Sequence, residues 1–168
     1  PVSLLNPQPG ETVLDLCAAP GGKTTQIAGR MAGEGLLVCN EINPKRAKIL
    51  GKNIERMGVS NALVLNEHPQ NLAKKFIGFF DRVLVDAPCS GLGLMRKKPD
   101  IRLKKDGNEI DSLTKIQREI LENAAGYAKE GGVLVYSTCT LCRKENEKNL
   151  EWILKNHPEF EAEDITSF

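Results

Sequence analysis

Two cysteines stand directly after strand-like runs in this sequence. Cys89 lies within D-A-P-C-S-G and Cys139 within S-T-C-T, and each motif follows a short apolar run rich in β-branched residues. In a doubly wound α/β domain, ligands bind beside the carboxyl ends of the strands. We therefore expect both thiols to face one site, where two thiols could divide the steps of a covalent reaction.

A turn of small residues follows the first strand-like run, within D-L-C-A-A-P-G-G-K-T. Gly21 and Gly22 allow the backbone to approach a ligand, and the helix that follows offers free N–H groups to an anionic moiety such as a carboxylate. The turn matches neither the Walker A spacing nor G-x-G-x-x-G. Glu41 comes about 20 residues later, where an acid can accept hydrogen bonds from ribose hydroxyls. The pattern favours an adenosine-type cofactor; taken alone, it fits a tight strand–helix turn with a surface glutamate equally well.

The net charge of +1 implies no polyanionic partner by itself, but one stretch is strongly basic. Between residues 96 and 105 the sequence has six basic side chains and one acid. Such a stretch is either a solvated loop or a surface that binds nucleic-acid phosphates. Its position shortly after Gly91 favours phosphate binding.

The cysteine count and the hydrophobic pattern indicate a cytoplasmic protein. Five cysteines and no export signal fit a reducing compartment, and no apolar run is long enough to span a membrane, so we expect no membrane partner. Cys17 and Cys39 are interpreted as buried apolar thiols. Cys139 and Cys142 form a lone C-x-x-C, which leaves a redox or zinc module as an alternative, although we expect no metal.

Strand-like and helical segments alternate along the whole chain. This alternation predicts an α/β fold with a doubly wound, mostly parallel, Rossmann-like sheet, formed by one domain over residues 1–168. The predicted strands are Thr12–Leu16, Leu36–Asn40, Ala62–Leu65, Arg82–Val85 and Gly132–Tyr136.

Three helices are predicted with their ends. One begins with Asn43 as N-cap and Pro44 at the first position, and Gly58 ends it. A second covers Glu109–Ala128, and Gly131-Gly132 ends that stretch before the fifth strand. A third, around Leu150 to Leu154, closes at N-H-P. His68, which follows the third strand, is interpreted as a loop residue rather than a ligand or base.

Three motifs in order resemble the Sun/Nol1/NSUN family of RNA (cytosine-5) methyltransferases. They are D-x-C-A-A-P-G-G-K-T from Asp15, D-A-P-C-S-G from Asp86, and Y-S-T-C-T from Tyr136, followed by E-N-E. The resemblance implies S-adenosylmethionine as cofactor, a sheet of order 3-2-1-4-5, and ribosomal RNA with an unpaired or flipped cytosine as partner.

The two halves of the chain resemble different bacterial branches of this family. Residues 96–101 and 117–121 are similar to the RsmB branch, whereas residues 40–47 and 79–82 are similar to the RsmF branch. A chimera joined near Gly91–Leu94 is therefore one hypothesis. A catalytically inactive engineered or chimeric α/β scaffold is the alternative to an active enzyme, and binding of S-adenosylmethionine would separate the two.

The family's motifs also imply roles for individual residues. Cys139 is the expected nucleophile, with a pKa lowered by helix termini or Lys23; Cys89 is expected to assist elimination, and Asp86 to bind the cytosine ring edge. The expected RNA-binding residues are Arg96, Lys97, Lys98 and Arg102. The expected cofactor-binding residues are Cys17, Ala18, Ala19, Pro20, Gly21, Gly22, Lys23, Glu41, Arg46 and Asp86.

The resemblance also implies features that this sequence does not contain. Many relatives have an aspartate after the third strand that meets the adenine amino group, and this chain has Asn66-Glu67-His68 there. The family carries further sequence before the position of Pro1 and a strand hairpin after that of Phe168. Without the hairpin, the edge of the fifth strand is exposed, which predicts a homodimer through that edge.

Overall fold

Five parallel strands form one sheet, in the order β3-β2-β1-β4-β5. This confirms the predicted fold class and strand order. The computed structural model describes residues 1–94, 97 and 107–165. The strands are β1 (Thr12–Asp15), β2 (Leu36–Asn40), β3 (Ala62–Leu65), β4 (Phe80–Asp86) and β5 (Ala128–Ser137). The helices are α1 (Val2–Leu5), α2 (Gly22–Met31), α3 (Pro44–Arg56), α4 (Pro69–Phe76), the 3₁₀ turn η1 (Leu92–Leu94), α6 (Gly107–Tyr127) and α7 (Glu147–Asn156).

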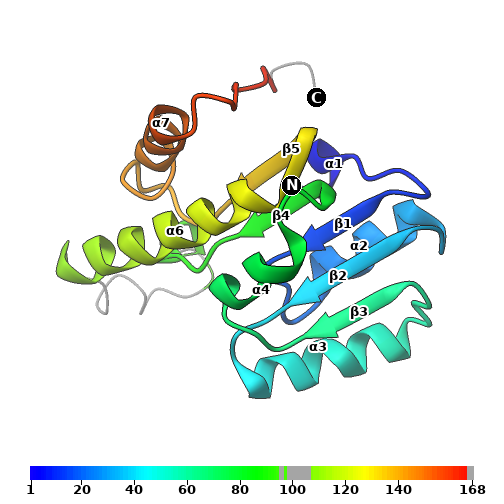
Figure 1. The fold of residues 1–168 in the computed structure, drawn as a ribbon. Coiled ribbons are helices and arrows are strands. Elements are labelled where there is room, and N and C mark those ends of the chain that lie inside the picture. The colour runs from blue at the N-terminus through cyan, green and yellow to red at the C-terminus, as the bar shows by residue number, and fades with distance from the viewer. Residues whose placement is uncertain (95–96, 98–106, 166–168) are drawn as a thin grey trace.

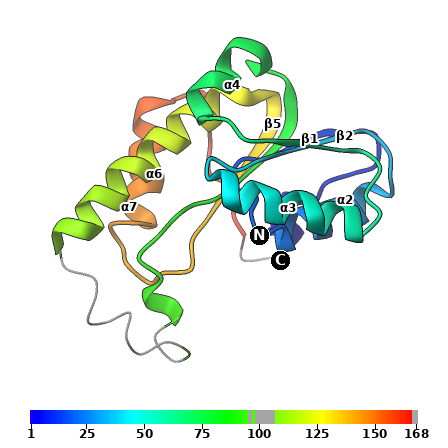
Figure 2. The same cartoon turned by 90° about the horizontal axis from the view of Figure 1, so that it is seen from below.

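Helices cover both faces of the sheet (Figures 1 and 2). On one face, Val13 and Leu37 pack with Leu5 of α1 and with apolar side chains of α2 and α3. On the other face, Leu14 and Val38 pack with apolar side chains of α4 and α6. Since successive strand residues point to opposite faces, the continuous apolar runs of β1 and β2 supply both cores.

The ends of α3 are as predicted. The Asn43 side chain accepts hydrogen bonds from the backbone N–H groups of Lys45 and Arg46, and Pro44 occupies the first turn. Gly58, just beyond the helix, has a φ of 65°, a conformation that costs a glycine little.

The predicted boundary between α6 and β5 is wrong. The helix ends at Tyr127 and β5 begins at Ala128, so Gly131 and Gly132 lie inside the strand rather than before it. The pairing of β4 with β5 shifts register between Phe80 and Arg82, opposite these glycines. A Cβ on Gly132 would lie 2.9 Å from the carbonyl oxygen of Lys129. The glycines therefore permit an irregularity within the strand, where they were predicted to end a helix.

The segment after β3 contains a helix that the sequence analysis placed in a loop. His68 is the N-cap of α4: its Nδ1 accepts the N–H of Gln70, and Pro69 occupies the first turn. The helix is eight residues long, and its N-cap is a histidine rather than one of the usual Ser, Thr, Asp or Asn.

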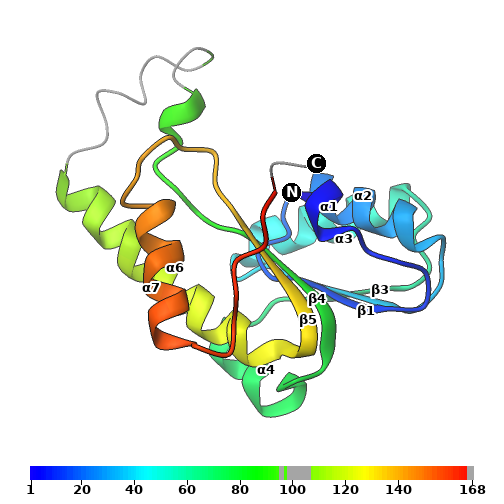
Figure 3. The ribbon, with the colours of Figure 1, turned by 90° about the horizontal axis from the view of Figure 1, so that it is seen from above.

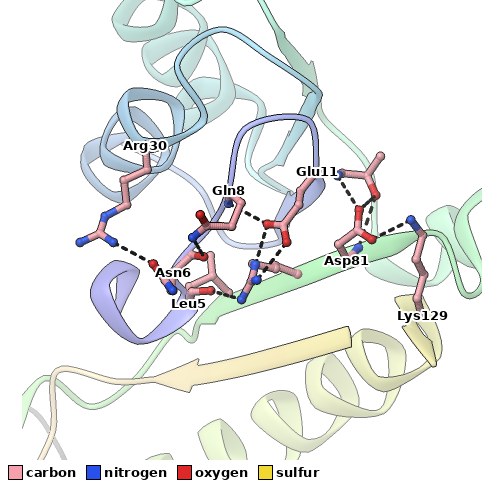
Figure 4. Close-up of polar contacts among 9 residues, drawn as sticks. Leu5, Asn6, Gln8, Glu11, Arg30, Asp81 and Lys129 are labelled. Carbon is pink, nitrogen blue, oxygen red and sulfur yellow. Dashed lines mark hydrogen bonds and ion pairs between the residues drawn. The ribbon is translucent and has the colours of Figure 1, made fainter. Parts of the chain in front are cut away.

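A set of polar contacts anchors the N-terminal segment at the amino end of the sheet (Figure 4). Arg82 of β4 makes two hydrogen bonds to the carboxylate of Glu11, at 2.6 and 2.9 Å, and a third to the carbonyl oxygen of Leu5. Beside it, Asp81 accepts hydrogen bonds from Thr12 and Lys129. These contacts hold residues 5–12 against the amino end of β4, whereas Pro1 lines a cavity together with Lys23 and Asp86.

β5 is one of the two outer strands of the sheet, with β3 at the other edge. A groove of about 450 Å³ runs beside β5, lined by Val133, Val135 and side chains of α7 and of residues 160–165. Figure 3 shows α7 and the segment that follows it running beside β5. No helix among the described residues is long and apolar enough to cross a membrane.

Candidate active site

The structure brings Cys89 and Cys139 together at the carboxyl ends of β4 and β5. Their Sγ atoms are 3.0 Å apart, and the backbone N–H of Cys139 donates a hydrogen bond to Cys89 Sγ at 3.3 Å. The Cys139 side chain is exposed and Cys89 is half-buried. Both line the same cavity, of about 310 Å³. The two thiols can therefore reach one ligand.

The pKa of the Cys139 thiol is raised to about 11. Partial burial disfavours the thiolate, and the hydrogen bond and charge of Cys89 disfavour it further. The lowered pKa that was predicted for Cys139 is therefore wrong. Lys23, one proposed cause of the lowering, is paired with Asp86 instead.

Asp86 lies between the thiols and the glycine turn. Its Oδ2 is 2.6 Å from Lys23 Nζ, and its Oδ1 accepts a hydrogen bond from Ser137 at 2.8 Å. About one third of each side chain in this ion pair remains exposed. Asp86 lines both the cavity of the cysteines and a second cavity beside the turn. It is therefore placed to contact groups bound in either.

Glu41 and Arg46 form one wall of the first cavity. Glu41 is buried; its Oε1 accepts the N–H of Asn43 and its Oε2 is 3.3 Å from Arg46. Arg46 also donates to the carbonyl oxygen of Ala19 at 2.5 Å. These contacts fix the Glu41 carboxylate at the end of β2, the position that the sequence predicts for an acid facing a ribose.

The glycine turn lines the second cavity, also about 310 Å³. Gly21 has a φ of 110° and is the N-cap of α2, a conformation that strongly favours glycine. A Cβ there would lie 3.1 Å from Leu50. Gly21 itself lines neither cavity; its predicted neighbours Cys17, Ala18, Ala19, Pro20, Gly22 and Lys23 line the second.

Asp15 is a site residue that the sequence analysis did not select. It is buried at the end of β1 and lines the second cavity; Thr24 donates to its Oδ2, whereas Oδ1 has no hydrogen-bond partner among the described residues. Burial raises the pKa of Asp15 to about 7. Its position as the first residue of the turn motif could have identified Asp15 as a candidate, but the motif does not show that the side chain is buried.

Glu145 is a second missed residue. It is the first residue of E-N-E, which carried no predicted role, yet it is fully buried behind the cysteines and bonded to Ser90. Sequence alone cannot distinguish this buried acid from the exposed Glu147 two positions later.

The other predictions for this part of the chain concern the remaining cysteines and a metal site. Cys39 is buried, as expected, whereas Cys17 is half-buried, lines both cavities, and has a pKa raised to about 12 by burial. Cys142 does not pair with Cys139; all five cysteines are free thiols. Over residues 1–94, 97 and 107–165, no three His, Cys, Asp or Glu side chains gather to hold a metal ion.

Of the predicted RNA-binding residues, only Lys97 is described, and it is exposed. Its N–H donates to the carbonyl oxygen of Leu94 at 2.9 Å. Arg96, Lys98 and Arg102 lie outside the described residues.

Curated proteins with similar sequences are ribosomal RNA methyltransferases. The chain is 41% identical over 162 residues to the 25S rRNA (cytosine-C(5))-methyltransferase nop2 of Schizosaccharomyces pombe, covering 94% of this chain and 27% of that protein. It is 44% identical over 152 residues to ribosomal RNA small subunit methyltransferase F of Shewanella loihica, covering 88% and 31%. The chain thus spans about a third or less of the length of these two relatives.

Solved structures show the same fold. The crystal structure of PH0851 superposes with a TM-score of 0.92 at 40% identity, covering 95% of this chain and 36% of that one. The structure of NSun6 from Pyrococcus horikoshii with SFG superposes with a TM-score of 0.85 at 33% identity, covering 92% and 39%. The family model for the 16S rRNA methyltransferase RsmB/F matches residues 2–168. Because this match extends over nearly the whole chain, the protein belongs to the RsmB/F family of S-adenosylmethionine-dependent rRNA methyltransferases.

Proposed function

We propose that this chain is the catalytic core of an enzyme that transfers a methyl group from S-adenosylmethionine to C5 of a cytosine in ribosomal RNA. The observation that carries the proposal is the 3.0 Å separation of the Cys89 and Cys139 sulfur atoms at the opening of a cavity that Glu41 also lines. Cytosine C5 is a poor nucleophile, and a thiolate that adds to C6 activates it.

The residues around the two cavities fit S-adenosylmethionine. The unpartnered Asp15 Oδ1 can accept a hydrogen bond from an ammonium group, and the N-terminus of α2 favours a carboxylate. Glu41 is placed for the ribose hydroxyls, with Arg46 holding it. When bound, the cofactor supplies the electrophilic methyl group.

In the proposed mechanism, the exposed Cys139 gives its proton to solvent, and the resulting thiolate forms a bond to C6. The electron pair displaced from the C5–C6 double bond makes C5 nucleophilic, and Asp86 holds the ring edge. After C5 carries the methyl group, Cys89 removes the C5 proton, and the C6–S bond breaks to return the Cys139 thiolate. The N–H of Cys139 donates to Cys89 Sγ, and this contact keeps the Cys89 sulfur beside Cys139.

The RNA must present an unpaired or flipped cytosine, because C5 and C6 of a stacked base are out of reach. Lys97 and the neighbouring basic residues are proposed to bind phosphates. Binding that depends on such contacts weakens as the salt concentration rises.

The test is covalent trapping. In a full-length context, the variant Cys89→Ser can still form the bond to C6, and the bound cytosine can still be methylated, but the base that releases the product is missing. This variant should therefore accumulate a protein–RNA adduct with S-adenosylmethionine and small-subunit ribosomal RNA. Cys139→Ala should form none. Denaturing gel electrophoresis with labelled RNA measures the adduct. An adduct that persists in Cys139→Ala would reverse the assigned roles.

A further inference from the structure

A buried carboxylate lies behind the thiol pair. Glu145 is fully buried and stands on the segment between β5 and α7. Its Oε1 accepts the backbone N–H of Ser90 at 2.9 Å and the side-chain amide N–H of Gln117 at 2.9 Å, and its Oε2 accepts the Ser90 hydroxyl at 2.5 Å. Because Ser90 directly follows Cys89, the carboxylate holds the Cys89 loop by both its backbone and its side chain.

The same cluster holds the Cys139 loop. Ser90 Oγ lies 2.9 Å from Thr140 Oγ1, and Thr140 directly follows Cys139. Because the single hydroxyl hydrogen of Ser90 goes to Glu145, Thr140 must be the donor in this pair. The hydrogen bonds therefore run in one direction, from Thr140 to Ser90 to the carboxylate, and join the two cysteine loops.

Two helices fix the orientation of this cluster. Gln117 of α6 donates one amide hydrogen to Glu145 and the other to the carbonyl oxygen of Pro88 at 2.9 Å. Its carbonyl oxygen accepts from Asn149 of α7 at 2.9 Å, and both side chains are buried. The Gln117 amide cannot turn over without losing all three bonds.

We infer that Glu145 is a positioning residue that holds the Cys89 and Cys139 thiols at one point. In the described part of the chain its side-chain bonds come from Ser90 and Gln117, which are neutral. A buried carboxylate without a cation is costly, and apolar packing often serves stability as well as buried charge does. What the carboxylate adds is two directed bonds from Ser90 in the loop of one cysteine and a third from Gln117 of α6, with Ser90 linked through its hydroxyl to the loop of the other cysteine.

The inference rests on the proposed function for its effect on catalysis, but the spacing of the thiols can be measured without any reaction on RNA. The protein is equilibrated with mixtures of glutathione and glutathione disulfide. As the Cys89–Cys139 disulfide forms, the two thiols lose two protons and two electrons, and one glutathione disulfide is reduced to two glutathione thiols. Peptide mass spectrometry gives the equilibrium constant, which is the effective concentration of one thiol at the other.

Three variants test how the Glu145 carboxylate contributes to the effective concentration of the two thiols. Glu145→Ala removes every bond of the carboxylate and should lower the effective concentration by about tenfold or more, the loss expected for hydrogen bonds to a charged group. Glu145→Gln keeps an acceptor for the two N–H donors, and Ser90 can turn its hydroxyl toward Thr140, so this variant should recover most of the wild-type value. Glu55→Ala, an exposed glutamate on α3, is the matched control and should change nothing.

Further measurements make each outcome decisive. If Glu145→Ala does not fold, as judged by urea denaturation, Ser90→Ala removes only the hydroxyl link and should lower the effective concentration by a smaller factor. In methyl transfer, kcat should fall while KM for the cofactor stays unchanged. A wild-type disulfide equilibrium in folded Glu145→Ala or Ser90→Ala would overturn the inference. If the variants change the equilibrium and the wild type transfers no methyl group, the positioning role stands and the proposed function fails.

Discussion

At the scale of single residues, the thiol pair determines how reactive the site is without RNA. With a pKa of about 11 for Cys139, on the order of one thiol in a thousand is ionised at pH 8. Because the thiolate is the nucleophile, the free site should react slowly with electrophiles at neutral pH.

The alkylation rate of Cys139 should therefore rise about tenfold for each pH unit between 8 and 10. Iodoacetamide labelling, followed for the Cys139 peptide by mass spectrometry, measures this profile. Cys89→Ala should lower the Cys139 pKa, because it removes the hydrogen bond and the charge that add to the effect of burial. Labelling at pH 8 should then be faster than in the wild type. A rate that is level between pH 8 and 10 would contradict the raised pKa.

The sequence was sufficient to select the two cysteines and most of the residues that line the second cavity, but not the electrostatics of these residues. Motif position selected Cys89, Cys139 and Glu41, since each follows a strand that is recognisable from its apolar run. The pKa of Cys139 depends on its burial and on a neighbour 50 positions away in sequence, and these are properties of packing. The same reason explains why Asp15 was missed.

At the scale of elements, the strands and α3 could be predicted because local signals agree with tertiary packing. Asn43 and Pro44 fix the start of α3, whatever lies around it. The boundary between α6 and β5 could not be predicted, because a glycine pair such as Gly131-Gly132 after a helical pattern usually marks the end of the helix. Their role here comes from a register shift against β4, which only the paired strand defines.

Gly93 shows how closely two elements approach. Its N–H donates to the carbonyl oxygen of Cys139 at 3.1 Å, and a Cβ on Gly93 would lie 2.7 Å from that oxygen. The contact is with backbone, so it cannot be relieved by rotating a side chain. The 3₁₀ turn η1 therefore supports the Cys139 loop directly.

Gly93→Ala should destabilise the protein by about 1–3 kcal/mol and reduce methyl transfer, because the Cys139 loop must move away from η1. Urea denaturation and initial rates of transfer measure the two effects. Gly51→Ala is the matched control: a Cβ at Gly51 in α3 meets nothing within 4 Å. This control should gain about 0.5–1 kcal/mol from helix propensity. Equal stability of the two alanine variants would argue against the close approach.

At the scale of the whole molecule, buried Asp15 links folding stability to pH. Its pKa rises from an ordinary value of 3.8 to about 7 because burial disfavours the charged form. The folded state therefore binds a proton that the unfolded state releases between these pH values. This contribution is fully present below pH 4 and is lost as the pH rises through 7, by about 4 kcal/mol in total.

Asp15→Asn cannot titrate, so its free energy of unfolding should gain on that of the wild type as the pH is raised from 4 to 8. Urea denaturation at several pH values measures the difference. Asp81→Asn is the control, because the pKa of Asp81 is lowered where that of Asp15 is raised. Burial opposes ionisation of Asp81, but bonds from Lys129 and Thr12 outweigh it and lower its pKa to about 2. The difference between Asp81→Asn and wild type should not change between pH 5 and 8. A constant difference for Asp15→Asn would show that Asp15 keeps its ordinary pKa.

The β5 edge of the sheet bears on the oligomeric state of the whole molecule. β5 is an outer strand, as the sequence analysis expected, but the comparisons give no support for a homodimer through it. Residues 160–165 and α7 line the groove beside β5 together with apolar side chains of that strand. The relatives match across both halves of the chain, and the origin of the chain as a chimera stays a hypothesis.

The strand order has a consequence for the nascent polypeptide. β1, β2 and β3 are consecutive in sequence and adjacent in the sheet, so the half that carries the glycine turn and Glu41 can assemble as soon as it leaves the ribosome. The free edge of β1 must then wait for β4, and Cys139 arrives only when β5 docks last. A translation product that stops before β5 would have its glycine turn and Glu41 but would lack the Cys139 thiol.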